Sequence, residues 1–233
     1  MLKRALAGAP ALLLLATLSA CGGDEDTTAS DATTSESPTT DATTDDASTD
    51  CTYTEDGSDP GVTLPPAEPT VSGEIAGTIE TSIGDLPITL DADGAPCTVG
   101  SFVALAEAGY FDDTPCHRLT VATGFEVLQC GDPTGTGRGG PGYSIPDEYD
   151  GSETYGKGTL AMANTGQPDS GGSQFFIVYG DTALPPLYTV FGTVDDEGTE
   201  AIADAADAGV DPVNDPEDGT PKTAIDITGV VID

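Results

Sequence analysis

The segment Leu160–Val178, with the sequence LAMANTGQPDSGGSQFFIV, constrains the fold of this 233-residue chain more than any other part of it. Both ends of the segment are apolar, and its middle is rich in Gly, Pro, Asn, Asp and Ser, which favours a turn. After the turn the residues alternate, so that Phe175 and Ile177 face one way while Gln174 and Phe176 face the other. The segment therefore predicts two strands joined by a turn, with a core face and an amphipathic face.

A second segment upstream, Cys116–Asp132, has the sequence CHRLTVATGFEVLQCGD and predicts two further short strands. These two segments and the residues that follow contain six short motifs. The motifs are His117-Arg118, Gly124-Phe125, Gln129-Cys130-Gly131-Asp132, Met162-Ala163-Asn164-Thr165-Gly166, Gly172-Ser173-Gln174-Phe175-Phe176 and Val190-Phe191-Gly192. In this order they resemble the cyclophilin-type peptidyl-prolyl cis-trans isomerases, and the resemblance covers roughly Val71 to Asp233.

The resemblance implies a mostly β chain with two helices, folded as a closed, eight-stranded antiparallel cyclophilin-like β-barrel. The residue pattern itself predicts a hairpin, two helices, a closing strand and a long Gly-rich surface loop. We expect the hairpin at Ile75–Thr81 and Leu86–Asp91, the helices at Val99–Ala108 (with Thr98 as N-cap) and Thr199–Ala208, the strand at Ile225–Ile232, and the loop at Gly131–Tyr143.

The activity that the resemblance implies requires no nucleophile, metal or cofactor, and the sequence predicts none. Rotation about the peptide bond before proline is opposed by a barrier of about 18–20 kcal/mol, because the C–N bond has partial double-bond character. A catalyst needs an apolar slot for the prolyl ring and a fixed donor that favours the twisted amide over the planar one. A guanidinium suits this task because it is always charged and can donate in two directions.

The resemblance also implies roles for individual residues. Arg118 matches the catalytic arginine of the family, and Gln129 matches the residue that orients it. Substrate binding is expected at Phe125, Val127, Asn164, Gln174, Phe176, Leu184 and Tyr188. His117, the only histidine, is expected to be structural and to point away from Arg118, because adjacent strand residues face opposite ways.

One departure from the family pattern leaves the lining of the proline pocket open. The family places the phenylalanine of its G-F motif three residues before the glutamine, whereas Phe125 lies four residues before Gln129 and Glu126 lies three before it. Either a β-bulge carries Phe125 into the pocket, or the carboxylate of Glu126 lines it. In the second case the carboxylate would compete for the charge of Arg118, and its replacement by Phe would raise turnover.

The N-terminal part of the sequence predicts export and lipid attachment. Residues 1–20 have two basic residues followed by an apolar run that is too short to span a bilayer, which is typical of a signal peptide. Leu18-Ser19-Ala20-Cys21 resembles a bacterial lipobox and implies a lipid on Cys21. Residues 21–70 are interpreted as this cysteine and a disordered acidic linker, because they can bury little apolar surface. The isomerase domain is expected at 71–233.

The charge of the chain limits its partners. It has 41 acidic and six basic residues, a net charge of −35, and removal of residues 1–20 leaves four basic residues and a net charge of −37. Nucleic acid is excluded, because its phosphates require basic side chains. Adsorption to anionic lipid is excluded for the same reason, so the membrane link is expected only through the lipid anchor. We expect a monomer outside the cytoplasm, anchored to the bacterial cell membrane, with proline-containing peptides and exported proteins as partners.

Four cysteines remain after Cys21 is assigned to lipid attachment. In an exported chain they predict two disulfides, whereas a zinc site would require more than one histidine or a C-x-x-C motif. Three pairings of Cys51, Cys97, Cys116 and Cys130 are open. If Arg118 and Gln129 share a strand face, Cys116 lies on that face and Cys130 on the other, which argues against a Cys116–Cys130 bond.

Two functions agree with these features. The first is a peptidyl-prolyl isomerase that assists the folding of exported proteins. The alternative is a non-catalytic module on the same fold, which would bind proline-containing peptides as a chaperone. A hydrolase is excluded, because the sequence offers no nucleophile–base pair.

Overall fold

The computed structural model describes residues 50–233. The predicted signal peptide, Cys21 and the first part of the predicted linker lie outside the described residues. Between residues 50 and 233, no helix is both long and apolar enough to span a bilayer. Export and lipid anchoring stay predictions, because they rest on residues 1–21.

The described part of the chain is mostly β with two helices, as predicted. The helices are α1 (Pro96–Glu107) and α2 (Asp196–Ala206). The strands are β1 (Thr54–Glu55), β2 (Glu74–Thr81), β3 (Gly84–Asp91), β4 (Thr114–Pro115), β5 (Arg118–Thr120), β6 (Phe125–Cys130), β7 (Tyr143–Ser144), β8 (Thr159–Met162), β9 (Phe175–Thr182), β10 (Val190–Val194), β11 (Val210–Asp215), β12 (Asp218–Pro221) and β13 (Asp226–Ile232).

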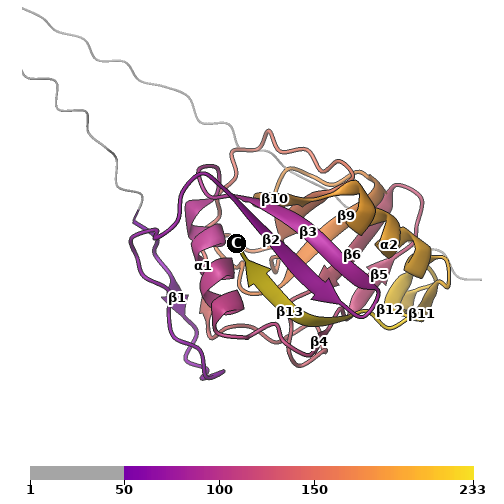
Figure 1. Cartoon of the computed structure of the whole chain (residues 1–233), viewed down its shortest axis with the longest axis horizontal. Coiled ribbons are helices and arrows are strands. Elements are labelled where there is room, and N and C mark those ends of the chain that lie inside the picture. Colours follow the sequence, from indigo (N-terminus) through magenta and orange to yellow (C-terminus); the bar gives the residue numbers. More distant parts are fainter. Residues whose placement is uncertain (1–49) are drawn as a thin grey trace, which may run out of the picture. The chain divides into compact units, whose positions relative to one another are not determined.

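Eleven of these strands form one antiparallel sheet that curls strongly into a half-barrel (Figure 1). Its hydrogen-bonded order is β11-β12-β5-β6-β9-β8-β10-β3-β2-β13-β4. This order has two edges, β11 and β4, so the sheet is not the closed ring of eight strands that was predicted. Although β4 and β5 are far apart in the order, only Cys116 and His117 separate them in the sequence. At these two residues the chain passes from β4, which pairs with β13, to β5 and the strands that carry the candidate site.

The predicted N-terminal hairpin is confirmed as β2 and β3. The two strands pair without interruption from Glu74 opposite Asp91 to Thr81 opposite Gly84. Gly84 has a φ of +127°, a conformation that disfavours residues with a side chain, so the turn falls where the sequence places glycine. Leu86, Ile88 and Leu90 of β3 are buried, which is the period-two pattern of a strand with one face in the core.

Helix α1 begins three residues earlier than predicted, at Pro96 rather than Val99. Its N-terminus is capped by a residue distant in sequence. The carboxylate of Glu148 accepts hydrogen bonds from the backbone N–H groups of Cys97 and Thr98, both at 2.8 Å. A carboxylate at this end of a helix satisfies free N–H groups and interacts favourably with the helix dipole. Thr98 is therefore inside the helix and does not act as its N-cap.

Helix α2 begins three residues before the predicted start and has a local cap. Asp195 accepts a hydrogen bond from the backbone N–H of Gly198 at 2.8 Å, and Asp196 and Glu197 place further negative charge in the first turn. The two helices lie at opposite ends of the sheet in Figure 1, α1 against β13 and α2 against β3 and β9. They cover apolar surface that the curled sheet leaves open at its ends.

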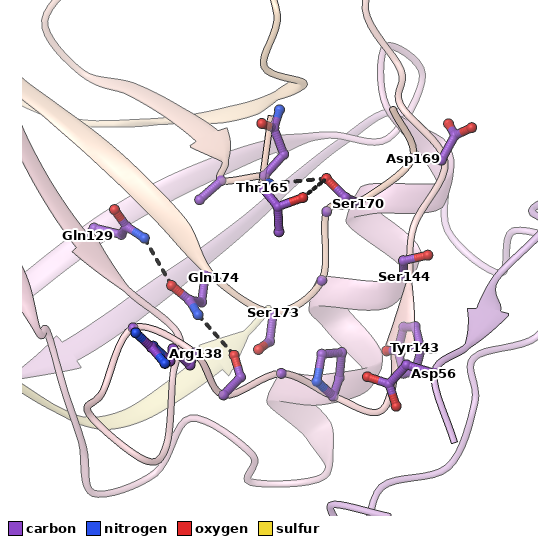
Figure 2. A pocket seen from close by; sticks show the side chains of 18 residues that line it. Asp56, Gln129, Arg138, Tyr143, Ser144, Thr165, Asp169, Ser170, Ser173 and Gln174 are labelled. Atoms are coloured by element: carbon purple, nitrogen blue, oxygen red, sulfur yellow. Dashed lines mark hydrogen bonds between the residues drawn. The ribbon is translucent and has the colours of Figure 1, made fainter. Parts of the chain in front are cut away.

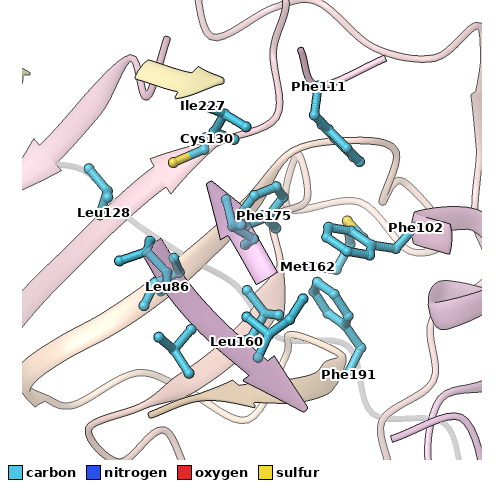
Figure 3. Packing of buried hydrophobic residues seen from close by; sticks show 14 of the residues in the cluster. Leu86, Phe102, Phe111, Leu128, Cys130, Leu160, Met162, Phe175, Phe191 and Ile227 are labelled. Atoms are coloured by element: carbon cyan, nitrogen blue, oxygen red, sulfur yellow. The ribbon is translucent and has the colours of Figure 1, made fainter. Parts of the chain in front are cut away.

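The main core is built around four phenylalanines (Figure 3). The ring of Phe102 from α1 lies 5.1 Å from that of Phe111, 5.6 Å from that of Phe175 and 5.4 Å from that of Phe191, centroid to centroid. Phe175 is fully buried here. Its neighbour Phe176 belongs to a separate apolar cluster on the other face of β9. The two faces predicted for this strand are therefore confirmed.

The four described cysteines form two disulfides, Cys51–Cys97 and Cys116–Cys130. The prediction of two disulfides holds, but the argument against Cys116–Cys130 is wrong. Strand β5 begins only at Arg118, and the backbone N–H of Cys116 donates to the carbonyl of Ile225 beside β13 instead. The alternation of side chains therefore does not extend from Arg118 back to Cys116, and the change of chain direction brings Cys116 to Cys130.

The folded unit begins earlier than residue 71. Strand β1 pairs with β7, the hydroxyl of Tyr53 donates to the carbonyl of Cys97 at 2.9 Å, and the N–H of Cys51 donates to the carbonyl of Ala67 at 2.7 Å. The C-terminal part of the predicted disordered linker is thus folded onto the domain. Composition predicts disorder here, but the disulfide of the buried Cys51 with Cys97 supplies stabilisation that a low apolar content does not.

Candidate active site

The guanidinium of Arg118 is fixed by two side chains from the two strands that flank β5. From β6, directly opposite Arg118 in the register, Gln129 accepts a hydrogen bond from Nη1 through its Oε1 at 3.1 Å. From β12, Asp218 accepts two hydrogen bonds, from Nε to Oδ1 at 2.8 Å and from Nη2 to Oδ2 at 2.7 Å. The guanidinium is therefore held on both sides rather than extended into solvent.

The charge of Arg118 is well supported by its surroundings. The hydrogen bond to Asp218 is the main cause that raises the pKa of the guanidinium above its ordinary value, and burial opposes this only in part. The side chain is 36% exposed, so it can reach a molecule bound at the surface. A permanently charged donor at the edge of an apolar cavity is the chemical requirement set out above.

Arg118 stands at the rim of a small cavity of about 170 Å³. Phe125, Val127, Gln129, Ala163, Asn164, Phe176, Leu184 and Tyr188 complete its lining. A cavity of about 150 Å³ lined by apolar side chains can hold a benzene ring, so this one has room for a five-membered ring. The cavity is partly open to solvent, and Val127 and Phe176 make its base apolar.

The base of the cavity has its own apolar cluster. Phe176 and Val127 are almost fully buried, and the rings of Phe176 and Tyr188 meet edge to face with centroids 5.3 Å apart. Tyr155 lies beneath them and fixes Tyr188, since its hydroxyl donates to the carbonyl of Tyr188 at 3.0 Å and accepts from the N–H of Tyr188 at 2.9 Å. The wall of the cavity is thus positioned before any ligand binds.

A β-bulge decides which residue faces the cavity near Arg118. The pairing of β6 with β9 shifts register between Phe125 and Val127. Phe125 lines the cavity, and its ring centroid is 5.5 Å from the Cζ atom of Arg118, a cation–π contact. Glu126 points instead toward Gly180 on β9 and is not part of the lining. Of the two alternatives left by the sequence, the structure therefore has the bulge.

A second cavity of about 420 Å³ adjoins the first and shares Gln129, Ala163 and Asn164 with it (Figure 2). A chain of amide hydrogen bonds connects the two. Gln129 donates from Nε2 to Oε1 of Gln174 at 2.9 Å, and Gln174 donates from Nε2 to the carbonyl of Gly139 at 2.9 Å. The amide that contacts Arg118 is therefore oriented in turn by a second amide and by the Gly-rich loop.

Comparison with known proteins identifies the family. Residues 77–231 match the family described as "Cyclophilin type peptidyl-prolyl cis-trans isomerase/CLD". The chain belongs to this family. Its cyclophilin domain thus contains every strand that carries the cavity, from β5 to β12, and the resemblance found in the six motifs is confirmed.

Among curated cyclophilins, the chain is 44% identical over 177 residues to the probable peptidyl-prolyl cis-trans isomerase B of Mycobacterium tuberculosis. This match covers 71% of the chain and 56% of the relative, so the chain spans little more than half of that protein's length. Peptidyl-prolyl cis-trans isomerase A of the same organism is 41% identical over 160 residues, covering 60% of the chain and 86% of the relative.

A solved structure shows the same cyclophilin fold. The isomerase of Cryptosporidium parvum, crystallised in the presence of the dipeptide Ala-Pro, superimposes with a TM-score of 0.57 at 33% identity. The superposition covers 68% of this chain and 98% of the Cryptosporidium chain. The match shows that the curled sheet of this chain has the cyclophilin fold.

The structure brings together the site residues expected from the cyclophilin motifs. Eight of them line the first cavity: Arg118, Phe125, Val127, Gln129, Asn164, Phe176, Leu184 and Tyr188. Gln174 lies in the second cavity and contacts the first through Gln129. The side chain of Asn164 connects two loops. It donates to the carbonyl of Leu187, between β9 and β10, at 2.8 Å and accepts from the N–H of Gly166, between β8 and β9, at 3.0 Å. The functional roles of these residues stay predictions.

Two residues near this cyclophilin site were not found by sequence reasoning. Asp218 contacts Arg118 from 100 positions away in the sequence, and no pattern in its hairpin connects the two. Tyr155 lies in a segment without regular structure, so no strand periodicity indicates that it is buried beneath Phe176. Only the sheet order, which places β12 beside β5, reveals the first contact.

The Gly-rich loop of the cyclophilin domain folds around a buried carboxylate. Asp132 has no exposed surface, and the backbone N–H groups of Thr134, Thr136, Arg138 and Gly139 donate to its two oxygens. Burial tends to raise its pKa, but these N–H groups and the Thr134 hydroxyl outweigh burial and lower it to about 2. The surface loop expected from composition is therefore organised by one aspartate.

His117 lies near this loop, and its predicted structural role stays a prediction. Burial lowers its pKa, so the ring is neutral at pH 7. Neither ring nitrogen has a hydrogen-bond partner among residues 50–233. The cyclophilin site described here makes no use of this histidine.

Proposed function

We propose that this chain catalyses the cis–trans isomerisation of peptide bonds that precede proline. The observation that carries the proposal is the charged guanidinium of Arg118, held by two flanking strands beside a cavity that has an apolar base and room for a prolyl ring. The relative from Cryptosporidium, solved in the presence of Ala-Pro, supports a proline-containing peptide as the ligand.

The cavity and the arginine make separate contributions. The prolyl ring binds by burial against Phe176, Leu184 and Tyr188, which do not distinguish the planar from the twisted amide. Twisting the bond removes amide resonance and concentrates electron density on the nitrogen, where a donor is more effective than in either planar state. Arg118 stabilises this twisted state selectively, and selective stabilisation of the transition state raises the rate.

Replacement of Arg118 by Ala tests the proposal. The loss of one charge-assisted donor raises the barrier by about 3 kcal/mol, so we expect the rate of isomerisation to fall roughly a hundredfold. Affinity for the peptide and the fold should largely be retained, because Phe176, Leu184 and Tyr188 at the apolar base of the cavity are unchanged. Exchange line-shape NMR on a proline peptide measures rate and affinity together.

The same experiment distinguishes the enzyme from the non-catalytic binding module. Equal exchange rates for the wild type and Arg118→Ala, with binding retained in both, would leave only the module. A Glu126 carboxylate within the pocket would favour the binding module, because it would compete for the charge of Arg118. Because Glu126 points away from the cavity, that reason is gone.

We further propose that the protein is a lipoprotein of the outer face of the bacterial cell membrane, where it assists the folding of exported proteins as a monomer. The lipobox-like sequence before Cys21 and the two disulfides of the domain support this location. Replacement of Cys21 by Ala should release the protein from the membrane fraction into the medium. Retention of the variant on the membrane would contradict lipid attachment at this residue.

A further inference from the structure

Arg118 makes two hydrogen bonds to Asp218 in addition to the one that it makes to Gln129. We infer that Asp218 is a positioning residue, which fixes the plane of the Arg118 guanidinium for the reaction. The inference deepens the proposed function and rests on it. It assigns a role in the site to the β11–β12 hairpin, which none of the six sequence motifs includes.

A count of donors shows what the arrangement leaves for a substrate. A guanidinium has five N–H groups in one plane. Three are used here, Nε–H and one on Nη2 by Asp218 and one on Nη1 by Gln129. Two N–H groups remain, one on each terminal nitrogen. Both oxygens of Asp218 accept hydrogen bonds along one edge of the guanidinium plane. Rotation of this plane about the terminal side-chain bonds of Arg118 would therefore break two hydrogen bonds at once.

The order of strands in the sheet places both hydrogen-bond partners of Arg118 beside it. Strand β5 lies between β6 and β12. Gln129 is directly opposite Arg118 on β6, whereas Asp218 is opposite Thr120 on β12, two residues along the same face as Arg118. Such diagonal neighbours are within reach of a long side chain. The arginine is thus held from both adjacent strands.

An ordinary surface ion pair is the alternative, and in a chain with 41 acidic residues it needs little explanation. Exposed pairs of this kind contribute little to stability. Two features favour positioning instead. The contact is bidentate, which restricts geometry as well as charge, and it involves the one arginine that lines the cavity.

We expect Asp218→Ala to lower kcat about tenfold with KM unchanged. The N–H donors of Arg118 are still present in this variant, but they are no longer held in a fixed orientation toward the substrate amide. Asp218→Asn should have an intermediate effect, since the amide keeps one acceptor. Asp211→Asn is the matched control: Asp211 is an exposed aspartate on β11, the partner strand of the same hairpin, and should leave kcat unchanged.

A double-mutant cycle with Arg118→Lys separates positioning from a general structural effect. Lysine has no planar fork to hold, so Asp218→Ala should cost much less in that background than in the wild type. Equal effects in both backgrounds would overturn the inference, because Asp218 would then act independently of the guanidinium. The Nε–H resonance of Arg118 gives a direct readout and should exchange slowly with solvent in the wild type and rapidly in Asp218→Ala.

The outcomes also separate this inference from the proposed function. If Arg118→Ala does not slow isomerisation, the proposed function fails. If Arg118→Ala slows it but Asp218→Ala does not, only the role of Asp218 fails. Faster turnover in Asp218→Ala would likewise overturn the inference, because the carboxylate would then restrain the arginine from the substrate.

Discussion

At the scale of single residues, the neighbours Phe125 and Glu126 have opposite surroundings because of one register shift. The bulge in β6 places the ring of Phe125 beside Arg118 and the carboxylate of Glu126 toward β9. A bulge leaves one extra residue on its strand and redirects the side chains on either side of it. Sequence spacing alone therefore could not decide which of the two lines the cavity.

We expect Phe125→Ala to weaken peptide binding about tenfold, because part of the apolar wall that covers the prolyl ring is lost, at a cost of about 1–2 kcal/mol. Glu126→Gln serves as the control and should change neither affinity nor exchange rate. NMR titration with a proline peptide measures both. A marked gain in turnover for Glu126→Gln would show that the carboxylate acts on Arg118 after all.

At the scale of elements, the loop between β6 and β7 depends on the charge of Asp132. Gly131 begins this loop with a φ of +86°, and a side chain there would collide with the backbone carbonyl of Ser173. The loop then turns so that four backbone N–H groups meet the buried carboxylate. Because Gly139 is hydrogen-bonded to Gln174, this loop supports the amide chain that ends at Arg118.

The depressed pKa of Asp132 predicts a loss of stability in acid. A carboxyl with a pKa of 3.8 when unfolded and about 2 when folded contributes about 2 kcal/mol to the free energy of unfolding at all pH values above about 4. This contribution decreases as pH falls from 4 to 2 and is absent below. Urea unfolding of the wild type and Asp132→Asn between pH 2 and 7 should show a stability difference that shrinks below pH 4. A difference independent of pH would contradict the assignment.

At the scale of the whole molecule, the excess of acidic residues should select among substrates by charge. The net charge of −35 attracts basic peptides over distances comparable to the Debye length, about 10 Å at 0.1 M salt. For a proline peptide with flanking lysines, we expect kcat/KM to fall about tenfold as salt is raised from low ionic strength to 0.5 M. A matched peptide with serines in place of lysines should show little change. Equal salt dependence for both would contradict electrostatic attraction.

The sequence predicts features that depend on residues close together in the chain, and it misses features that depend on contacts between distant segments. The hairpin of β2 and β3 and the two faces of β9 depend on neighbours in the sequence, so alternation was sufficient. The cap of α1 by Glu148, the contact of Asp218 with Arg118 and the Cys116–Cys130 bond depend on which distant strands become adjacent. The family resemblance supplied the residues of the cavity, but not the side chains that hold them in place.

The order of strands along the chain has a consequence for biosynthesis. β12, which brings Asp218 to Arg118, and β13, which pairs with both β2 and β4, follow every other element of the described chain. A chain that has emerged only as far as α2 already contains Arg118 and Gln129, but it lacks the strand that joins β2 to β4. Pairing of such distant segments is slow to form. The newly made protein therefore gains its complete site only when its last strands emerge, and truncated products remain without it.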